Sequence, residues 1–346
     1  MSQPAVATYL VTGCAGFIAA RVCELLLEAG HEVLGVDNLN AAYDPRLKEW
    51  RLARLRSFPR FRFEALDISD RKSVENLFVN ERERQRLCQP ASRDQAPFAA
   101  VINLAARAGV RASVADPWVY YRTNCEGALN LLEACRQFGV RKYILASTSS
   151  LYGAHNPVPY DESADTDRPL SPYAASKKAA ETIAYTYHHL YGTDVSVLRY
   201  FTVYGPAGRP DMSIFRFIRA IAEGEPIVVY GDGTQSRDFT YVDDIARGTI
   251  LALRPVGYEV INLGGDAPAV LNDVIDTIAR LVGKPVHRTT RPRHPADVPA
   301  TWANIRKARE ILGWQPQVPL EEGLRRTVAW YWENRDFVCS LELGPW

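Results

Sequence analysis

Short hydrophobic runs alternate with longer segments of helical periodicity up to about residue 200. The runs expected to form buried strands are 7–12, 31–37, 61–66, 99–104, 142–147 and 195–199. The segments expected to form helices are 17–29, 121–138 and 173–191. Strands that alternate with helices in this way form a parallel sheet with helices on both of its faces. The pattern therefore predicts an α/β fold with a Rossmann-like, doubly wound parallel sheet.

The character of the chain changes after Gly205, where prolines and glycines become frequent and the elements between them become shorter. We expect this part to form a smaller α/β domain that caps the sheet. The predicted sheet domain covers 1–204 plus about 237–262, and the smaller domain covers about 205–236 plus 263–346. The polar segment 80–97 interrupts the alternation, and we interpret it as a solvated helix end followed by a loop.

Composition narrows the classes of function. The 346 residues carry 41 basic and 40 acidic side chains, and this near-neutral balance argues against a general nucleic-acid binder. No apolar run approaches the ~18 residues of a membrane span, and the first residues lack the pattern of a signal peptide. The cysteines form no C-x-x-C pair and no cluster with His at metal spacing, so we expect free thiols and no metal site. These features predict a cytoplasmic protein.

A glycine-rich turn follows the first predicted strand. Gly13 and Gly16 stand in the spacing G-x-x-G-x-x-A, and Phe17 and Ile18 open the helix behind them. Such a turn brings backbone N–H groups and the positive end of a helix dipole to a pyrophosphate. We therefore expect these residues to bind a dinucleotide.

The ends of the next strands supply the other groups that a dinucleotide requires. Asp37, followed by Asn38, ends the second strand, and a carboxylate there binds a ribose hydroxyl and repels a 2′-phosphate. This position predicts NAD rather than NADP. Asp67 and Ile68 follow the third strand and are expected beside the adenine. Leu104, Ala105 and Ala106 lie at the end of the fourth strand, where the small alanines would let the cofactor lie close to the sheet.

Tyr173 and Lys177 stand four residues apart on a predicted helix and therefore share one face. A free tyrosine has a pKa of about 10, which is too high for a base at neutral pH. A nearby ammonium lowers that pKa, and lysine is scarce in this chain, so the pair is a candidate acid–base site. The hydroxyls of Thr148 and Ser150 follow a strand and alternate onto one face. Either one is a candidate partner for a substrate oxygen.

Several stretches together resemble the extended short-chain dehydrogenases/reductases, and within them the nucleotide-sugar 4-epimerases. They are VTGCAGFIAA, VDNLNAAYDPRLKEWRLARL, NLAARAGVRAS, SPYAASKKAAE, RYFTVYGPAGRPDM, SRDFTYVDDIA and ADVPATWANI. The second, third and fifth stretches are most similar to UDP-glucuronate 4-epimerases. The chain departs from the pattern at Asn103, where the family often has His, and at Ala19 and Ala20, where Gly-Ser is more usual.

The resemblance implies NAD-dependent, redox-neutral inversion of UDP-glucuronate to UDP-galacturonate through a transient 4-keto sugar. Tyr173 would take the proton of the 4-hydroxyl, Lys177 would hold the nicotinamide ribose, and Asn124 would be a structural link beside the cofactor. Thr202 and Arg209 resemble the pair that binds the sugar carboxylate. The other substrate-binding positions that we assign are Arg111, Ser213, Tyr230, Arg237 at the diphosphate and Asp297 at the uridine ribose.

Two alternatives stay open at this point. The first is an epimerase of another UDP-sugar, either UDP-glucose/UDP-galactose or an N-acetylated uronate. The second is a non-catalytic NAD-binding regulator, against which Tyr173 and Lys177 stand. Related dehydratases and decarboxylases carry acidic residues where this chain has Ser149 and Ser150, so the sequence does not favour those reactions. The resemblance also implies a homodimer in which helices within 112–138 and 173–191 form an intersubunit bundle.

Overall fold

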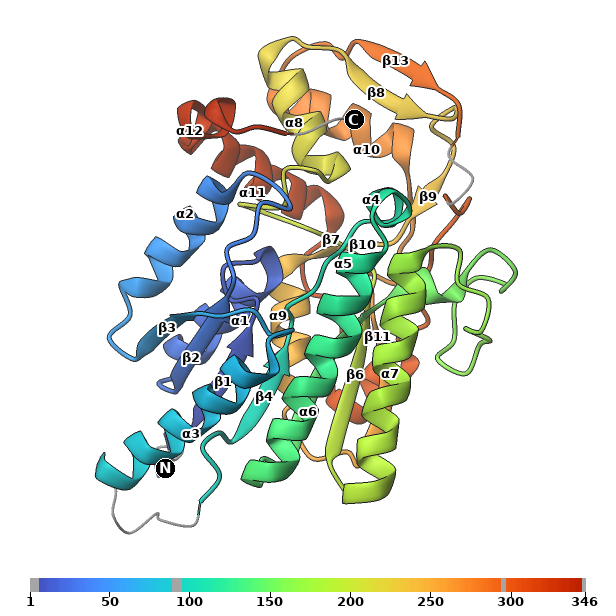
Figure 1. The fold of residues 1–346 in the computed structure, drawn as a ribbon. Coiled ribbons are helices and arrows are strands. Elements are labelled where there is room, and N and C mark those ends of the chain that lie inside the picture. The colour runs from blue at the N-terminus through green and yellow to red at the C-terminus, as the bar shows by residue number, and fades with distance from the viewer. Residues whose placement is uncertain (1–5, 89–94, 294–296, 344–346) are drawn as a thin grey trace.

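The computed structural model describes residues 6–88, 95–293 and 297–343. A seven-stranded parallel sheet forms the centre of the larger part of the molecule, with strand order β11-β6-β5-β4-β1-β2-β3 (Figure 1). Its strands are β1 (Thr8–Thr12), β2 (Glu32–Asp37), β3 (Phe61–Ala65), β4 (Ala100–Asn103), β5 (Lys142–Thr148), β6 (Asp194–Tyr200) and β11 (Tyr258–Leu263). The chain reverses its direction of strand addition between β1 and β4. Ligands bind at the carboxyl ends of the strands at such a point.

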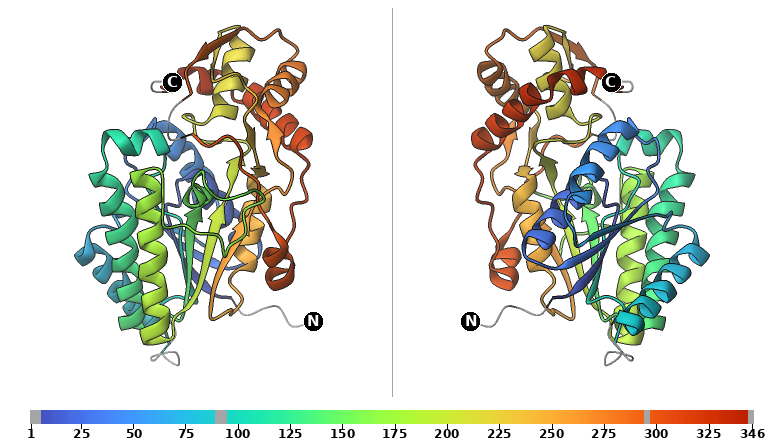
Figure 2. Two further views of the ribbon diagram at one scale, coloured as in Figure 1. Left: turned by 90° about the vertical axis from the view of Figure 1, so that its right-hand side faces the viewer. Right: turned by 90° about the vertical axis from the view of Figure 1, so that its left-hand side faces the viewer.

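Helices cover both faces of this sheet (Figure 2). One face is covered by α3 (Arg71–Cys88), α6 (Gly127–Phe138) and α7 (Pro172–Tyr191). The other is covered by α1 (Phe17–Glu28) and α9 (Val242–Leu251), which pack against each other. This arrangement confirms the predicted doubly wound α/β fold. Of the polar segment 80–97, residues 80–88 continue α3, and 89–94 lie outside the described residues.

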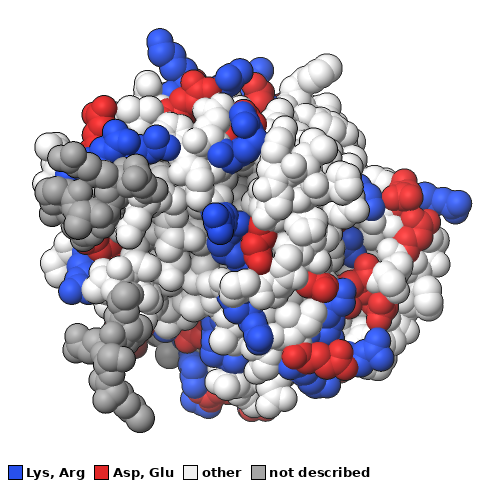
Figure 3. Space-filling model, turned by 90° about the horizontal axis from the view of Figure 1, so that it is seen from below, with Lys and Arg blue, Asp and Glu red and all other residues white. Residues whose placement is uncertain are grey.

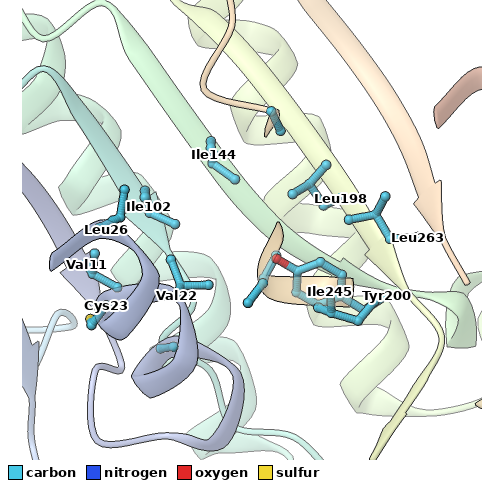
Figure 4. Packing of buried hydrophobic residues seen from close by; sticks show 14 of the residues in the cluster. Val11, Val22, Cys23, Leu26, Ile102, Ile144, Leu198, Tyr200, Ile245 and Leu263 are labelled. Carbon is cyan, nitrogen blue, oxygen red and sulfur yellow. The ribbon is translucent and has the colours of Figure 1, made fainter. Parts of the chain in front are cut away.

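Buried aliphatic side chains hold these layers together. Val22 and Leu26 of α1 and Ile245 of α9 meet the sheet residues Val11 and Leu198 (Figure 4). Each of these five residues is at most 1% exposed. The apolar spacing of helix 17–29 therefore reflects contact with the sheet, as its periodicity predicts.

A second group of elements packs above the carboxyl ends of the strands. They are α8 (Ser213–Glu223), β8 (Ile227–Tyr230), α10 (Leu271–Val282), β13 (Arg288–Arg291), α11 (Leu320–Glu333) and α12 (Arg335–Ser340). Short strand pairs connect the two groups: β7 (Thr202–Tyr204) with β10 (Phe239–Tyr241), and β9 (Ser236–Arg237) with β12 (Ala269–Val270). A cleft between the two groups thus opens directly over the strand ends.

The structure differs from the sequence expectations at two helices. The predicted helix 121–138 is divided into α5 (Trp118–Tyr121), a π-helical turn η2 (Arg122–Glu126) and α6. The helix α2 (Pro45–Arg56) is not predicted, because charged residues interrupt its apolar positions. The other short helices of the described residues are α4 (Val110–Ala115), η3 (Ser149–Tyr152) and η4 (Ala308–Leu312).

Charges of both signs are mixed over the face of the molecule that Figure 3 shows. Viewed from below in Figure 3, Lys and Arg side chains lie beside Asp and Glu side chains, and neither sign covers the face. No helix in the described part of the chain is long and apolar enough to cross a membrane.

Candidate active site

The glycine turn closes tightly at the end of β1. Gly13 has a left-handed φ of +70°, and a Cβ there would lie 2.8 Å from the Cα of Ala105. The N–H of Gly16 donates to the carbonyl of Gly13 at 2.7 Å, and Gly16 then caps α1 without a side-chain hydrogen bond. The first N–H groups of α1 therefore remain available for an anion at the edge of the cleft.

Carboxylates line the cleft at the ends of β2 and β3. Asp37 is buried and accepts the N–H of Leu39 at 2.8 Å. Asn38 donates to Asp67 at 2.8 Å, which joins the two strand ends. Burial alone would raise the pKa of Asp67, but hydrogen bonds from Ser69 and Asn38 outweigh it and lower that pKa. Both carboxylates are thus placed to accept hydroxyl or amine hydrogens.

Lys48 is a residue of this site that the sequence analysis missed. It lies on α2, is 5% exposed, lines the cleft, and places Nζ 3.6 Å from the Asp37 carboxylate. The ring of Tyr43 lies 5.3 Å from the same Nζ. A lysine in a polar, weakly amphipathic helix gives no sequence signal of burial.

Two buried asparagines form hydrogen bonds that join segments next to the cleft. Asn103 accepts from the Thr12 hydroxyl and donates to the Tyr143 hydroxyl, both at 2.8 Å. Asn103 is thus fully engaged at the position where the family often has His. Asn124 binds both the N–H and the carbonyl of Arg107 and donates to Ser176 at 2.9 Å. It does not line the cleft, and its contacts fit the structural link that the resemblance implies.

Tyr173 and Lys177 both line the cleft from α7. Burial raises the pKa of Tyr173, while a hydrogen bond with Thr148 and the charge of Arg209 oppose that rise. The sequence predicts Lys177 as the group that lowers this pKa, and the structure assigns that effect differently. Lys177 Nζ donates to the carbonyl of Ala146 at 2.8 Å, and burial lowers its own pKa to about 8.

The structure distinguishes the two candidate hydroxyls. Thr148 is buried at the end of β5 and hydrogen-bonds to Tyr173. Its hydroxyl also lies 3.2 Å from that of Ser150. Ser150 lines a neighbouring hollow together with Thr202 and Arg237. The hydroxyl pair therefore leads from Tyr173 toward the second group of elements.

Arg209 reaches the same cleft from the loop after β7. Its Nε and Nη2 bind Asp211 at 3.0 and 2.5 Å, and Nη2 also donates to the carbonyl of Ala108 at 3.3 Å. Burial alone would lower the pKa of Arg209, but Asp211 reverses the effect and raises it. Thr202 and Ser213 line a small adjoining pocket with Arg209. A permanent cation thus lies close to Tyr173.

The remaining predicted substrate residues lie at the neighbouring hollow, which Ser150, Arg237 and Asp297 line, or connect to it through the bond from Arg111 to Asp297. Arg111 binds Asp297 at 2.7 Å and stacks on the Tyr230 ring, with its Cζ 3.8 Å from the ring centroid. Arg237 lines the same hollow as Asp297 and donates to the carbonyl of Ser236 at 2.7 Å. Burial, with Arg293 and Arg111 nearby, lowers the pKa of Arg237 although Asp297 opposes this. The two arginines outnumber the one carboxylate of Asp297, so the surroundings of this hollow carry a positive charge.

The structure brings most of the predicted cofactor residues to one cleft. The predicted residues that line it are Gly13, Gly16, Phe17, Ile18, Asp37, Asn38, Asp67, Ile68, Leu104, Ala105, Ala106, Tyr173 and Lys177. The lining residues that the sequence analysis missed include Asn40, Tyr43, Lys48, Thr123 and Tyr200. Carboxylates at two strand ends, an uncapped helix N-terminus and a tight glycine turn fit a dinucleotide. Within the described residues, no group of His, Cys, Asp and Glu side chains suits a metal ion.

Comparison with known proteins finds similarity over nearly the whole chain. The profile of the NAD dependent epimerase/dehydratase family matches residues 9–264. A UDP-glucuronate 4-epimerase of Thermodesulfobacterium geofontis is 54% identical over 336 residues, which cover 97% of this chain and 99% of that protein.

Solved structures show the same similarity. The UDP-glucuronic acid 4-epimerase of Bacillus cereus, in complex with UDP-glucuronic acid and NAD, has a TM-score of 0.85 and 34% identity, covering 94% of this chain and 99% of that one. The UDP-glucose 4-epimerase of Thermotoga maritima has a TM-score of 0.84 and 32% identity, covering 95% and 99%. The fold, the cleft and these similarities agree, and the chain belongs to the NAD dependent epimerase/dehydratase family.

Proposed function

We propose that the protein interconverts UDP-glucuronate and UDP-galacturonate with NAD as its cofactor. The observation that carries the proposal is one continuous cleft. It joins the glycine turn at Gly13 and Asp37 to Tyr173, and then to the cation of Arg209. A sugar nucleotide that bears a carboxylate requires these features together, because a carboxylate in a closed site needs a charged partner.

The chemistry divides between the cofactor and the chain. Gly13, Gly16 and Asp37 would hold NAD, which when bound would supply the acceptor and donor of the hydride at C4 of the sugar. Tyr173 takes the proton of the 4-hydroxyl and gives it back, and Thr148 hydrogen-bonds the tyrosine at this position. Lys177, fixed by the carbonyl of Ala146, holds the nicotinamide ribose. Atoms and electrons balance over one cycle, because the same hydride and the same proton return.

Arg209 and Thr202 are the residues that we assign to the sugar carboxylate. The 4-keto form of a uronate is a β-keto acid and loses CO2 readily. A fixed cation that holds the carboxylate in a conformation unsuited to C–C cleavage suppresses that loss. The bonds from Arg209 to Asp211 and Ala108 support this role, since they fix the guanidinium before substrate arrives.

The nucleotide half of the substrate fits the positively charged hollow beside the cleft. We assign Arg237 and Arg111 to the diphosphate, and Asp297 and Tyr230 to the uridine. Ser213, at the start of α8, faces the pocket that it shares with Arg209. The Arg111–Asp297 pair and the stacking of Arg111 on Tyr230 join the two groups of elements beside this hollow.

We further propose a homodimer located in the cytoplasm. Large apolar side chains are exposed on α4 to α7, with Trp118 79%, Leu190 59% and Tyr185 52% exposed. A second copy that packs against these helices would cover them. The free thiols Cys14 and Cys23 support a reducing compartment.

The test is a substrate panel followed by NMR without added cofactor. The purified protein is incubated separately with UDP-glucuronate, UDP-galactose and UDP-N-acetylglucosamine. We expect UDP-galacturonate to form from UDP-glucuronate, and bound NAD to be released when the protein is denatured. Conversion of the neutral sugars alone would replace the proposal with a neutral-sugar 4-epimerase. No turnover of any substrate would leave an NAD-binding protein without catalysis.

A further inference from the structure

Arg51 is a buried cation in the middle of α2. It is 3% exposed, yet each of its hydrogen bonds among the described residues ends on a neutral acceptor. The ring of Tyr43 lies 5.6 Å from its Cζ, and the Tyr43 hydroxyl accepts from Nη1 at 2.8 Å. Burying a charge without a counter-charge is unfavourable. The buried charge of Arg51 therefore suggests that this residue has a role in holding the segments to which its N–H groups donate.

The guanidinium of Arg51 joins two loops that line the active site. Nη1 donates to the carbonyl of Ala15 in the glycine turn at 3.0 Å. Nε and Nη2 both donate to the carbonyl of Ala207, at 3.0 and 2.7 Å, and Nη2 also reaches that of Gly208 at 3.2 Å. These two carbonyls immediately precede Arg209.

The loop that Arg51 holds is conformationally unusual. Ala207 has a left-handed φ of +51°, which a residue with a Cβ adopts only when its surroundings enforce it. The two hydrogen bonds to the Ala207 carbonyl provide such enforcement. Asp211 and the Ala108 carbonyl fix the guanidinium at the tip of the Arg209 side chain. Arg51 fixes the backbone that immediately precedes Arg209.

We propose that Arg51 is a positioning residue that holds the Arg209 loop against the glycine turn and thereby sets selectivity for sugars that carry a carboxylate. The proposal rests on the proposed function, in which Arg209 binds that carboxylate. Its physical basis is the fork of donors, because one rigid group fixes the distance between the cofactor loop and the substrate loop. Lysine retains the charge but not the fork, so the two contributions can be separated.

The experiment compares Arg51→Lys and Arg51→Met holoenzymes with wild type, in the presence and absence of Arg209→Ala. Arg54→Lys is the matched control. Arg54 lies on the same helix, is exposed, binds Glu24 at 3.1 Å and stacks on Trp50, away from both loops. The readouts are the dissociation constants of UDP-glucuronate and UDP-glucose by calorimetry, and amide hydrogen exchange of segment 205–209.

We expect Arg51→Lys to weaken UDP-glucuronate binding about tenfold or more and to change UDP-glucose binding by less than about twofold. Exchange becomes faster in 205–209. Arg51→Met, which loses the charge as well as the fork, is expected to behave similarly, because the fork that both variants lack is what holds the loop. In the Arg209→Ala background the effect of Arg51 on uronate affinity disappears, since the two residues act in series. Arg54→Lys changes neither readout.

Three results would overturn the proposal. Equal loss of affinity for both nucleotides would indicate a general role in folding. An Arg51 effect that persists in the Arg209→Ala background would place its action elsewhere. Unchanged exchange in 205–209 would show that Arg51 does not hold the loop. If Arg209→Ala alone leaves uronate affinity unchanged, the role of Arg209 is wrong, while faster exchange confined to 205–209 still supports the link to the loop.

Discussion

Replacing Lys48 by Met breaks the buried ion pair at the predicted ribose site. The two side chains are 6% and 7% exposed, and Lys48 Nζ lies 3.6 Å from the Asp37 carboxylate. Two unit charges at this distance attract each other by about 5 kcal/mol at an effective dielectric constant of about 20. Desolvation offsets part of this attraction, but removing one partner leaves a buried charge alone. We therefore expect Lys48→Met to lower the free energy of unfolding by about 3 kcal/mol.

The assay is urea unfolding followed by circular dichroism, on protein freed of bound nucleotide so that differences in cofactor affinity do not enter. Lys48→Met, Asp37→Asn and the double variant form a thermodynamic cycle. We expect the double variant to lose clearly less stability than the two single variants together. The matched control is Lys307→Met, which breaks a partly exposed pair with Glu259 at 3.1 Å. That pair is expected to contribute less than about 1 kcal/mol.

Additive losses would refute this reasoning, because they would mean that Lys48 and Asp37 do not stabilise each other. A loss for Lys48→Met no larger than that for Lys307→Met would refute it as well, since burial would then have no influence on the strength of the pair.

Four further predictions concern the site and the stability of the fold. Tyr173→Phe lowers kcat about 10³-fold because the proton acceptor is lost, while NAD stays bound; steady-state kinetics and a NAD assay check both. Arg209→Ala raises the KM for UDP-glucuronate about tenfold or more and releases a pentose product; unchanged uronate kinetics would count against it. Gly13→Ala places a Cβ 2.8 Å from the Cα of Ala105 and forces a residue with a side chain to adopt a φ of +70°. We therefore expect the amount of bound NAD and the Tm both to fall. A variant that retains its full NAD content would contradict this geometry. Hydrogen bonds from Arg335 and Tyr331 lower the pKa of Glu223 to about 2. Its stabilisation is therefore present above about pH 4.5 and lost as the pH falls toward 2. Glu223→Gln should lower Tm at pH 7, with a difference from wild type that closes on acidification.

The parts of the fold that follow local rules could be predicted from the sequence. A short hydrophobic run identifies β1, which is buried within the sheet, and period-3.6 patterns identify α1 and α7, which bury an apolar face against it. The glycine turn and Asp37 could be predicted because backbone geometry and strand ends fix their positions. For the same reason the cleft contains nearly all of the predicted cofactor residues.

What could not be predicted depends on tertiary contacts between charged groups. Lys48 and Arg51 lie on α2, whose polar sequence is typical of a solvated helix, yet both are buried because acceptors from distant segments converge on them. The electrostatics of Tyr173 could not be predicted for the same reason. Spacing along α7 places Lys177 on its face, but only the fold shows that Lys177 binds the Ala146 carbonyl and that Arg209 approaches from another loop.

We propose that this protein inverts C4 of UDP-glucuronate by reversible hydride transfer within one cleft. The most direct test of this proposal is proton NMR of UDP-glucuronate that carries deuterium at C4, incubated with the purified protein and no added cofactor. We expect UDP-galacturonate that retains the deuterium at C4, because the hydride leaves and returns without exchanging with solvent. UDP-galacturonate in which C4 carries a solvent proton, or a sample that contains only unchanged UDP-glucuronate, would contradict this proposal.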